Sequence, residues 1–326
     1  MSRTAVLLRA DGGPGIGGGH VMRARTLSDA LLDEGFDVHL FSKDNAWIRS
    51  VQPMFRCRVR LLKAADNESL ILFQSARRLG ARLIVLDVQS TSPEYVKYLQ
   101  GSGATVITID DPGLGADAAD ATFRAGHKLR RENNYYYGFP YAILPPALLK
   151  LRDGSREPEA VRSAVIFLGT FDARGYGRWI PDIAGRFPQI AFSWFTDSAA
   201  APHANLQILG LSQNLFWEKL AAADLAIISG GVTLYETTTL GRPAVVLPQA
   251  PHETEQAKFF ADAGAVCLVD PPSFEQLAGV LSALAGAKDR LAAMHDRSME
   301  LADGRGLERF LEAVRRLLSR STIAAG

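Results

Sequence analysis

Residues 225–248, LAIISGGVTLYETTTLGRPAVVLP, decide the fold. The first four residues form a short apolar run, which is typical of a buried strand in a parallel sheet. Ser229-Gly230-Gly231 interrupts the run, and residues 233–240 are then expected to form a helix. Gly241 and Pro243 end that helix, and AVVL forms the next buried strand. The stretch therefore predicts a strand, a glycine turn, a helix and a second strand of an α/β sheet.

The glycine turn is a candidate anion site. Glycine lets a ligand approach the backbone closely, and the first turn of a helix directs free N–H groups and a positive dipole end to the same place. This predicts a phosphate or diphosphate site, with Glu236 one turn further along to accept hydrogen bonds from a ribose diol. The alternative is an ordinary strand-to-helix turn, because a lone glycine turn is a weak signal.

Length and composition indicate an enzyme-sized globular protein. The chain has 326 residues, which exceeds one typical core, so about two domains are expected. The net charge of +1 gives no indication of a nucleic-acid partner. No apolar run approaches the roughly 20 residues of a membrane span, and the first residues do not form a signal peptide. Cys57 and Cys267 fit neither a disulfide framework nor a metal site. We therefore expect a cytoplasmic protein without stable membrane insertion.

The first half of the chain begins with a βαβ pattern. Residues 5–8 form a predicted strand, and six glycines lie between that strand and His20. An amphipathic helix follows from Val21 and ends at Gly35, before a strand over 36–41. Further on, the pattern predicts helices over 69–79 and 93–100, and strands over 83–87 and 105–109.

The middle of the chain has a less regular pattern. Residues 112–140 are expected to be irregular, and Tyr135-Tyr136-Tyr137 within them either packs a loop or provides a platform for a sugar or base. Pro145-Pro146 and the charged run 150–159 favour a linker.

A second run of strands and helices begins at 164–167. It continues with strands over 190–195, 206–209 and 268–269, and helices over 216–223, 273–284 and 307–320. The fold class is therefore α/β, with two doubly wound, Rossmann-like domains, 1–155 and 156–326, facing each other across a cleft.

Four aspartates follow predicted strands of the first domain: Asp11, Asp87, Asp110 and Asp111. The carboxyl ends of parallel strands meet at one edge of a sheet, so these carboxylates are expected to gather at the rim where ligands bind. The alternative is that Asp87 and Asp110 only cap the next helix or turn.

These segments together resemble the two-domain GT-B glycosyltransferase fold. The opening stretch is similar to the donor-nucleotide segment of the peptidoglycan N-acetylglucosaminyltransferase group. Within the fold, the chain most resembles the UDP-sugar hydrolase of the pseudaminic acid pathway and related spore-coat polysaccharide proteins. The matching pieces are Arg9-Ala10-Asp11, Ile16-Gly17-Gly18-Gly19-His20-Val21-Met22-Arg23, Asp110-Asp111, residues 138–144, residues 230–236, Gln256, and Asp303-Gly304-Arg305-Gly306.

The resemblance implies a substrate and a set of contacts. The hydrolase releases UDP from UDP-2,4-diacetamido-2,4,6-trideoxy-altrose by inverting cleavage of the bond between sugar C1 and oxygen. Its base maps onto His20, its diphosphate and ribose contacts onto Gly231, Val232, Thr233 and Glu236, and its uracil contact near Leu211. The helix start after Gly231 can hold the diphosphate charge without a metal ion, so we expect neither a metal nor a cofactor. The substrate-binding residues expected in all are Asp11, Gly17, Gly19, Gln89, Gly169, Leu211, Gly231, Val232, Thr233, Glu236 and Gln256.

The sugar side departs from the family pattern at two positions. Gln89 stands where the family commonly has tyrosine, and Pro145 where it usually has arginine. Three classes of function therefore stay open: a hydrolase that uses water, a glycosyltransferase that uses another acceptor, and a non-catalytic nucleotide-sugar binder. The partner in each case is a UDP-sugar, and the oligomeric state is left open.

The chemistry itself favours His20 as the base. Diphosphate leaves readily once its charge is held, whereas the attacking water or hydroxyl needs a proton acceptor. His20 follows a flexible glycine loop at a helix start, where the dipole favours the neutral ring. The alternative is a helix-start residue that only bonds the backbone. His252 and Glu253 are further candidates for sugar contacts.

Overall fold

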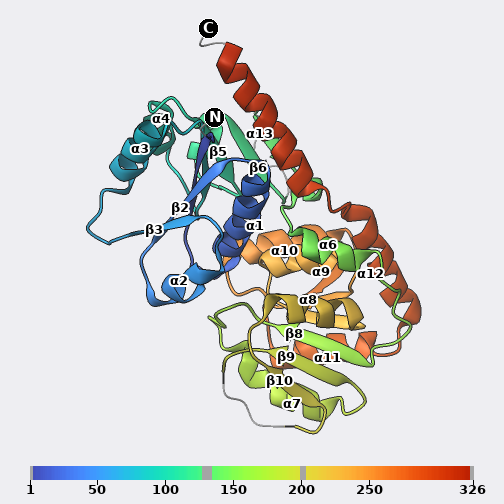
Figure 1. The fold of residues 1–326 in the computed structure, drawn as a ribbon. Coiled ribbons are helices and arrows are strands. Elements are labelled where there is room, and N and C mark those ends of the chain that lie inside the picture. The colour runs from blue at the N-terminus through green and yellow to red at the C-terminus, as the bar shows by residue number, and fades with distance from the viewer. Residues whose placement is uncertain (1–2, 127–133, 199–202, 324–326) are drawn as a thin grey trace. The chain divides into compact units, whose positions relative to one another are not determined.

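The computed structural model describes residues 3–126, 134–198 and 203–323. The chain forms two compact units. The N-terminal unit contains Met1–Ile143 together with Arg305–Gly326, and the C-terminal unit contains Leu144–Gly304. Each unit is an α/β body with its own parallel sheet (Figure 1).

The sheet of the N-terminal unit has the order β3-β2-β1-β4-β5-β6-β7, and all its pairings are parallel. Its strands are β1 (Ala5–Ala10), β2 (Asp37–Lys43), β3 (Arg58–Leu62), β4 (Leu83–Asp87), β5 (Thr105–Ile109), β6 (Ala121–Arg124) and β7 (Tyr135–Tyr137). The chain passes from β3 back to the other side of β1 to form β4. This reversal creates a crevice at the carboxyl ends of β1 and β4, where doubly wound folds bind ligands.

Helices cover both faces of this sheet. They are α1 (Gly19–Asp33), α2 (Ala46–Val51), α3 (Glu68–Leu79), α4 (Pro93–Gln100), α5 (Gly115–Ala118) and α13 (Gly306–Ile323), with short 3-10 turns η1 (Gln52–Met54) and η2 (Phe139–Tyr141). Alternate residues of β1 face opposite cores: Val6 packs with α1 and α13, whereas Leu7 packs with α3 and α4. Because both faces are covered, residues 5–8 of β1 form a continuous apolar run rather than an alternating one.

The sheet of the C-terminal unit has the order β10-β9-β8-β11-β12-β13 and is also parallel throughout. Its strands are β8 (Ser163–Phe167), β9 (Ala191–Phe195), β10 (Leu206–Leu209), β11 (Leu225–Ile228), β12 (Ala244–Val246) and β13 (Val266–Leu268). The same reversal of strand order occurs between β8 and β11, so the ligand crevice of this unit is expected at their carboxyl ends.

The helices of this unit are α6 (Pro146–Arg152), α7 (Ile180–Arg186), α8 (Gln213–Ala222), α9 (Val232–Thr239), α10 (Pro251–Asp262), α11 (Phe274–Leu284) and α12 (Lys288–Leu301), with η3 (Tyr176–Trp179). One face of the sheet forms a core with α7, α11 and α12. On the other face, Phe216 of α8 lies 5.2 Å from the ring of Phe167 and 5.3 Å from that of Phe195. The expected α/β class and the doubly wound sheets are confirmed.

Two segments differ from the expected structure. Residues 112–140 are not wholly irregular, since they contribute α5, β6 and β7; those at 127–133 lie outside the described residues. The three tyrosines form edge strand β7, where Tyr136 stacks on Phe123 with 4.6 Å between ring centroids. These strands are only four and three residues long, too short for a clear periodic pattern. The expected linker over 150–159 also begins inside a helix, α6, which buries Leu148.

The end of the chain returns to the N-terminal unit. The division lies near residue 143 rather than 155, and α13 packs on the first sheet. Phe310 of α13 is fully buried, with its ring centroid 5.0 Å from that of Phe123. Arg309 also donates a hydrogen bond to the carbonyl of Pro140. An apolar stripe shows that a helix packs on a sheet but not which sheet, so the sequence pattern assigned this helix to the second domain.

Candidate functional site

A glycine loop leads from β1 to His20. Gly13, Gly15 and Gly17 have φ angles of 130°, 81° and 89°, which favour glycine. A side chain at Gly12 would lie 2.4 Å from the Trp47 ring, so glycine is also required there by packing. The loop ends at Gly19, the first residue of α1, and brings His20 to the carboxyl ends of β1 and β4.

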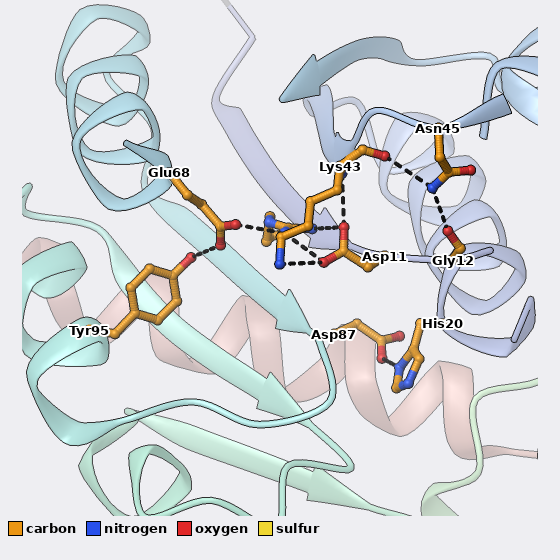
Figure 2. A network of polar contacts seen from close by, with 9 residues as sticks. Asp11, Gly12, His20, Lys43, Asn45, Glu68, Asp87 and Tyr95 are labelled. Atoms are coloured by element: carbon orange, nitrogen blue, oxygen red, sulfur yellow. Dashed lines mark hydrogen bonds and ion pairs between the residues drawn. The ribbon is translucent and has the colours of Figure 1, made fainter. Parts of the chain in front are cut away.

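His20 contacts a buried carboxylate. Its Nδ1 atom lies 2.6 Å from Oδ1 of Asp87, the last residue of β4 (Figure 2). Asp87 also accepts two hydrogen bonds of 2.7 Å from the guanidinium of Arg23, three residues after His20 on α1. Arg23 continues the network to Asp110 at the end of β5. The strand-end carboxylates Asp87 and Asp110 thus meet around one arginine, and neither acts only as a helix cap.

This network fixes the chemical roles of the two ring nitrogens. Burial alone would raise the pKa of Asp87, but the guanidinium of Arg23 and His20 lower its pKa below the usual range. Because an ionised carboxylate can only accept hydrogen bonds, Nδ1 of His20 must carry the proton. In the neutral ring Nε2 is then the nitrogen that can accept a proton from a reacting group.

The Asp11 carboxylate is held by hydrogen bonds from neighbouring protein groups. Its carboxylate accepts hydrogen bonds of 2.6 and 2.7 Å from buried Arg9 and one of 2.8 Å from the backbone N–H of Lys43. Arg9 in turn bonds Glu68, which also accepts from the Tyr95 hydroxyl (Figure 2). These contacts occupy much of the Asp11 carboxylate.

A pocket of about 400 Å³ lies next to this network in the N-terminal unit. It is lined by Arg9, Asp11, Ile16, Lys43, Glu68, Val88, Gln89, Ser90, Thr91, Ser92 and Tyr95. The predicted residues Asp11 and Gln89 both line this pocket. Its hydroxyl, amide and paired ionic groups make it a polar pocket.

The predicted anion site of the C-terminal unit lies at the carboxyl end of β11. Gly231 is the N-cap of α9, and no side chain caps the helix. Val232 and Thr233 are the first two residues of α9, so their N–H groups belong to the unsatisfied first turn. This turn meets the requirements for binding an anion through backbone groups.

Two residues of α10 hold the turn in shape. Glu253 accepts hydrogen bonds from the backbone N–H groups of Gly230, at 3.2 Å, and Gln249, at 2.8 Å. Gln256 donates to the carbonyls of Gly230, at 2.8 Å, and Gly231, at 3.3 Å. A Cβ at Gly230 would lie 2.7 Å from Glu253, so this close approach requires glycine. The Glu253 and Gln256 side chains thus contact the turn itself.

Glu236 lies one turn into α9 and is almost fully buried. Its Oε1 accepts a hydrogen bond of 2.9 Å from the indole Nε1 of Trp217 on α8. The Thr233 hydroxyl is a second hydrogen-bonding partner. Burial raises the pKa of Glu236 to about 7, and the two hydrogen bonds only partly offset this.

The other two predicted residues of this unit follow the carboxyl ends of β8 and β10. Gly169 follows β8 with a φ of 86°, and a Cβ built on it would lie 3.6 Å from the Ser229 hydroxyl. Leu211 is exposed in the loop before α8, and its N–H lies 3.4 Å from a carboxylate oxygen of Asp197. His252 is exposed at the start of α10.

Sequence reasoning assigned no role to Arg23, Glu68 or Trp217. Two signals pointed to Arg23: it ends the glycine-loop segment that resembles the family, and its i+3 spacing from His20 places both residues on one face of α1. Trp217 and Glu236 are 19 residues apart on different helices, so no periodic pattern relates them.

Two kinds of feature are absent from the part of the chain that the structure describes. No group of three or more His, Cys, Asp or Glu side chains there is arranged to hold a metal ion. No helix within it combines the length and apolar character needed to cross a membrane.

The two units have the Rossmann-like α/β architecture of the GT-B glycosyltransferase fold. The structure aligns with MurG of Acinetobacter baumannii with a TM-score of 0.69 and 15% identity, covering 97% of this chain and 100% of MurG. No protein-family model matches the chain.

Curated proteins of similar sequence include a polysaccharide biosynthesis protein and a sugar transferase. The chain is 25% identical to the spore coat polysaccharide biosynthesis protein SpsG of Bacillus subtilis (strain 168), over 92% of this chain and 94% of SpsG. It is also 35% identical, over 102 residues, to the UDP-N-acetylglucosamine–N-acetylmuramyl-(pentapeptide) pyrophosphoryl-undecaprenol N-acetylglucosamine transferase of Shewanella amazonensis (strain ATCC BAA-1098 / SB2B). That match covers 29% of this chain and 28% of the transferase.

Proposed function

We propose that this chain is a nucleotide-sugar enzyme that releases UDP from a UDP-linked sugar. The observation that carries the proposal is the uncapped glycine turn at Gly231, followed one helical turn later by the buried carboxylate of Glu236. A diphosphate would bind the first N–H groups of α9, and the ribose hydroxyls would bind Glu236. Leu211 would contact the base through its backbone.

The N-terminal unit would supply the general base, His20, which removes a proton from the attacking water. In the proposed reaction a water molecule attacks sugar C1, and Nε2 of His20 accepts the water proton. The C1–O bond to the diphosphate breaks, its electron pair leaves with UDP, and the sugar is released with inverted configuration at C1. Asp87 would orient the His20 ring and stabilise the charge that the ring acquires.

The names of the relatives support this class of substrate. SpsG is a polysaccharide biosynthesis protein, and the matched transferase uses UDP-N-acetylglucosamine. The finer proposal, a deoxy-diacetamido sugar of the UDP-2,4-diacetamido-2,4,6-trideoxy-altrose type used in nonulosonic acid or surface polysaccharide biosynthesis, rests on the sequence resemblance in the glycine loop alone.

A second candidate function is transfer of the sugar to an acceptor other than water. The polar pocket of about 400 Å³ in the N-terminal unit favours it, because such a volume accommodates a hydroxyl-bearing acceptor. In this reaction His20 would accept the proton of an acceptor hydroxyl, and UDP would leave in the same way.

The test is a screen of UDP-, CMP- and GDP-sugars for nucleotide release without added acceptor. The proposal predicts release from a UDP-sugar, with one free sugar molecule formed for each UDP. UDP binding with release only when an acceptor is present would instead support transfer. Failure to bind any UDP-sugar, or binding without turnover under both conditions, would refute the enzyme assignment.

A further inference from the structure

The Glu236 carboxylate is held by a group from a different helix. Trp217 is 3% exposed and Glu236 is 7% exposed, and the indole N–H of Trp217 donates to Oε1 across 2.9 Å. An indole is a donor only, so this hydrogen bond requires an acceptor oxygen of Glu236 at that position. Breaking it would leave a buried donor unsatisfied, which is unfavourable.

The hydrogen bond also determines which part of the carboxylate is left for a ligand. An ionised carboxylate has about four acceptor positions on its two oxygens. Trp217 occupies one on Oε1, and the Thr233 hydroxyl is a second protein partner. The remaining acceptor positions could accept two donors of a vicinal diol.

We propose that Trp217 is a positioning residue for the nucleotide, which fixes the Glu236 carboxylate so that its free edge receives the two ribose hydroxyls. This inference rests on the proposed nucleotide site. It adds a residue on α8 to a site otherwise built from the glycine turn and α9.

The position of Trp217 on α8 gives the contact a second consequence. The loop that contains Leu211 leads directly into α8, and Trp217 lies in the second turn of that helix. Phe216, its neighbour in sequence, packs on Phe167 and Phe195 and so fixes α8 on the sheet. Helix α8 would therefore fix the positions of both the loop that contacts the nucleobase and the carboxylate that contacts the ribose.

The charged groups around α9 have other partners. Glu253 of α10 accepts a hydrogen bond from the glycine turn, and His295 of α12 contacts the carbonyl of Gly241. Arg152 of α6 donates to the carbonyl of Met299. Arg242 donates to three backbone carbonyls, those of Arg156, Ala223 and Leu240. Burial, Trp217 and Thr233 are the causes of the altered pKa of Glu236. Burial raises it, and the Trp217 hydrogen bond lowers it, so removing the indole N–H must raise it further.

This gives a signature that a merely structural tryptophan would not produce. The ionised carboxylate accepts both ribose hydroxyls, whereas the protonated form has lost an acceptor position. Affinity for a ribonucleotide should therefore rise with pH as Glu236 ionises. The affinity for a nucleotide without ribose hydroxyls should not show this rise with pH.

The experiment is calorimetric titration of the parent and the Trp217→Phe variant with UDP and with 2′,3′-dideoxy-UDP from pH 5.5 to 8.5. The dideoxy analogue has the same diphosphate, so the effect of diphosphate ionisation on affinity cancels in the ratio of the two affinities. Phenylalanine keeps an aromatic ring in the core but removes the N–H donor. Trp194→Phe, at another buried tryptophan of the same unit, is the matched control.

In the parent, the ratio of UDP to dideoxy-UDP affinity should rise about tenfold over this range, equivalent to about 1.4 kcal/mol. In Trp217→Phe the rise should move to higher pH, lowering UDP affinity at pH 7 about fivefold, with dideoxy-UDP affinity within about twofold of the parent. The control should follow the parent. A Trp217→Phe variant that matches the parent, or one that loses affinity for both nucleotides equally, would overturn the inference. Absence of UDP binding by the parent would refute the proposed function itself.

Discussion

Nδ1 of His20 lies 2.6 Å from Oδ1 of Asp87, and Asp87 is held from its other side by Arg23. This pairing joins the start of α1 to the end of β4, the two elements that border the crevice of the first sheet. It orients the histidine ring, a condition for a side chain that removes a proton in a transition state.

The first prediction concerns Asp87→Asn. The amide can donate to Nδ1 and so stabilise the wrong tautomer of His20, with the proton on Nε2. We expect UDP release to fall by about 10²–10⁴-fold, with UDP affinity within about threefold of the parent. Steady-state kinetics and calorimetry measure the two quantities.

Asp110→Asn is the matched control for this change. Asp110 also contacts Arg23, but it has no contact with His20 among the interactions described above. It has a φ of 50°, a conformation that asparagine tolerates. Equal losses of turnover in the two variants would show that the Arg23 network matters only for folding.

The second prediction concerns stability and Glu236. Burial raises its pKa from 4.5 to about 7, so folding favours the protonated carboxyl. The resulting stabilisation is complete below the unfolded pKa and is lost as pH rises through the folded pKa. Between pH 4.5 and about 7 this amounts to about 3 kcal/mol in the free energy of unfolding.

Urea unfolding of the parent and Glu236→Gln at pH 5 and pH 8 measures this contribution. The glutamine has the same shape and does not ionise. The parent should lose more stability than the variant between the two pH values. An identical pH dependence for both proteins would show that Glu236 ionises as freely as an exposed carboxyl.

The third prediction concerns Glu253, which accepts hydrogen bonds from Gly230 and Gln249. Glu253→Ala should leave two N–H groups without their partner and loosen the glycine turn, weakening UDP binding by about tenfold. Glu253→Gln keeps an acceptor oxygen and removes a negative charge beside the proposed diphosphate, so UDP should bind at least as tightly as to the parent.

Glu255→Ala, at an exposed position on the same helix, should bind UDP like the parent. If Glu253→Ala also binds UDP normally, the turn does not depend on α10 for its shape.

The fourth prediction concerns the return of α13 to the N-terminal unit. Phe310 is fully buried against Phe123, so Phe310→Ala should lower the free energy of unfolding by about 3–5 kcal/mol. Glu312→Ala on the exposed side of α13 should change it by less than about 0.5 kcal/mol. Similar unfolding curves for the two variants would contradict the packing of this helix.

Most of the central strands could be predicted from sequence. Strands β4, β5 and β11 begin and end at the expected residues, because buried parallel strands are short apolar runs bounded by turn residues. The edge strand β10 also has its expected bounds. Helix α9 lies within one residue of its expected bounds, since glycines flank it on both sides. Helices α10 and α12 were not predicted, because few of their residues are apolar.

The site could be predicted only in part. The glycine turn, Glu236 and His20 stand out because each lies beside glycines at the end of a predicted strand. Asp87 stands out as a strand-end carboxylate, but its pairing with His20 does not, because the two residues are 67 positions apart in sequence. Trp217 does not stand out either, because it comes from another helix. Glu253 was one candidate for a sugar contact, and its Oε2 accepts hydrogen bonds from two backbone N–H groups at the turn, contacts that the sequence did not indicate.

The central claim is that His20 is the base of a UDP-releasing enzyme, and one comparison tests it most directly. UDP release and UDP binding are measured for the parent and for His20→Asn, in which a polar side chain remains but no usable base does. The account predicts that turnover falls by about 10²–10⁴-fold while UDP affinity stays within about threefold of the parent. Equal turnover of the two proteins would remove His20 from the chemistry, and joint loss of binding and turnover would make it a ligand contact or a folding residue instead.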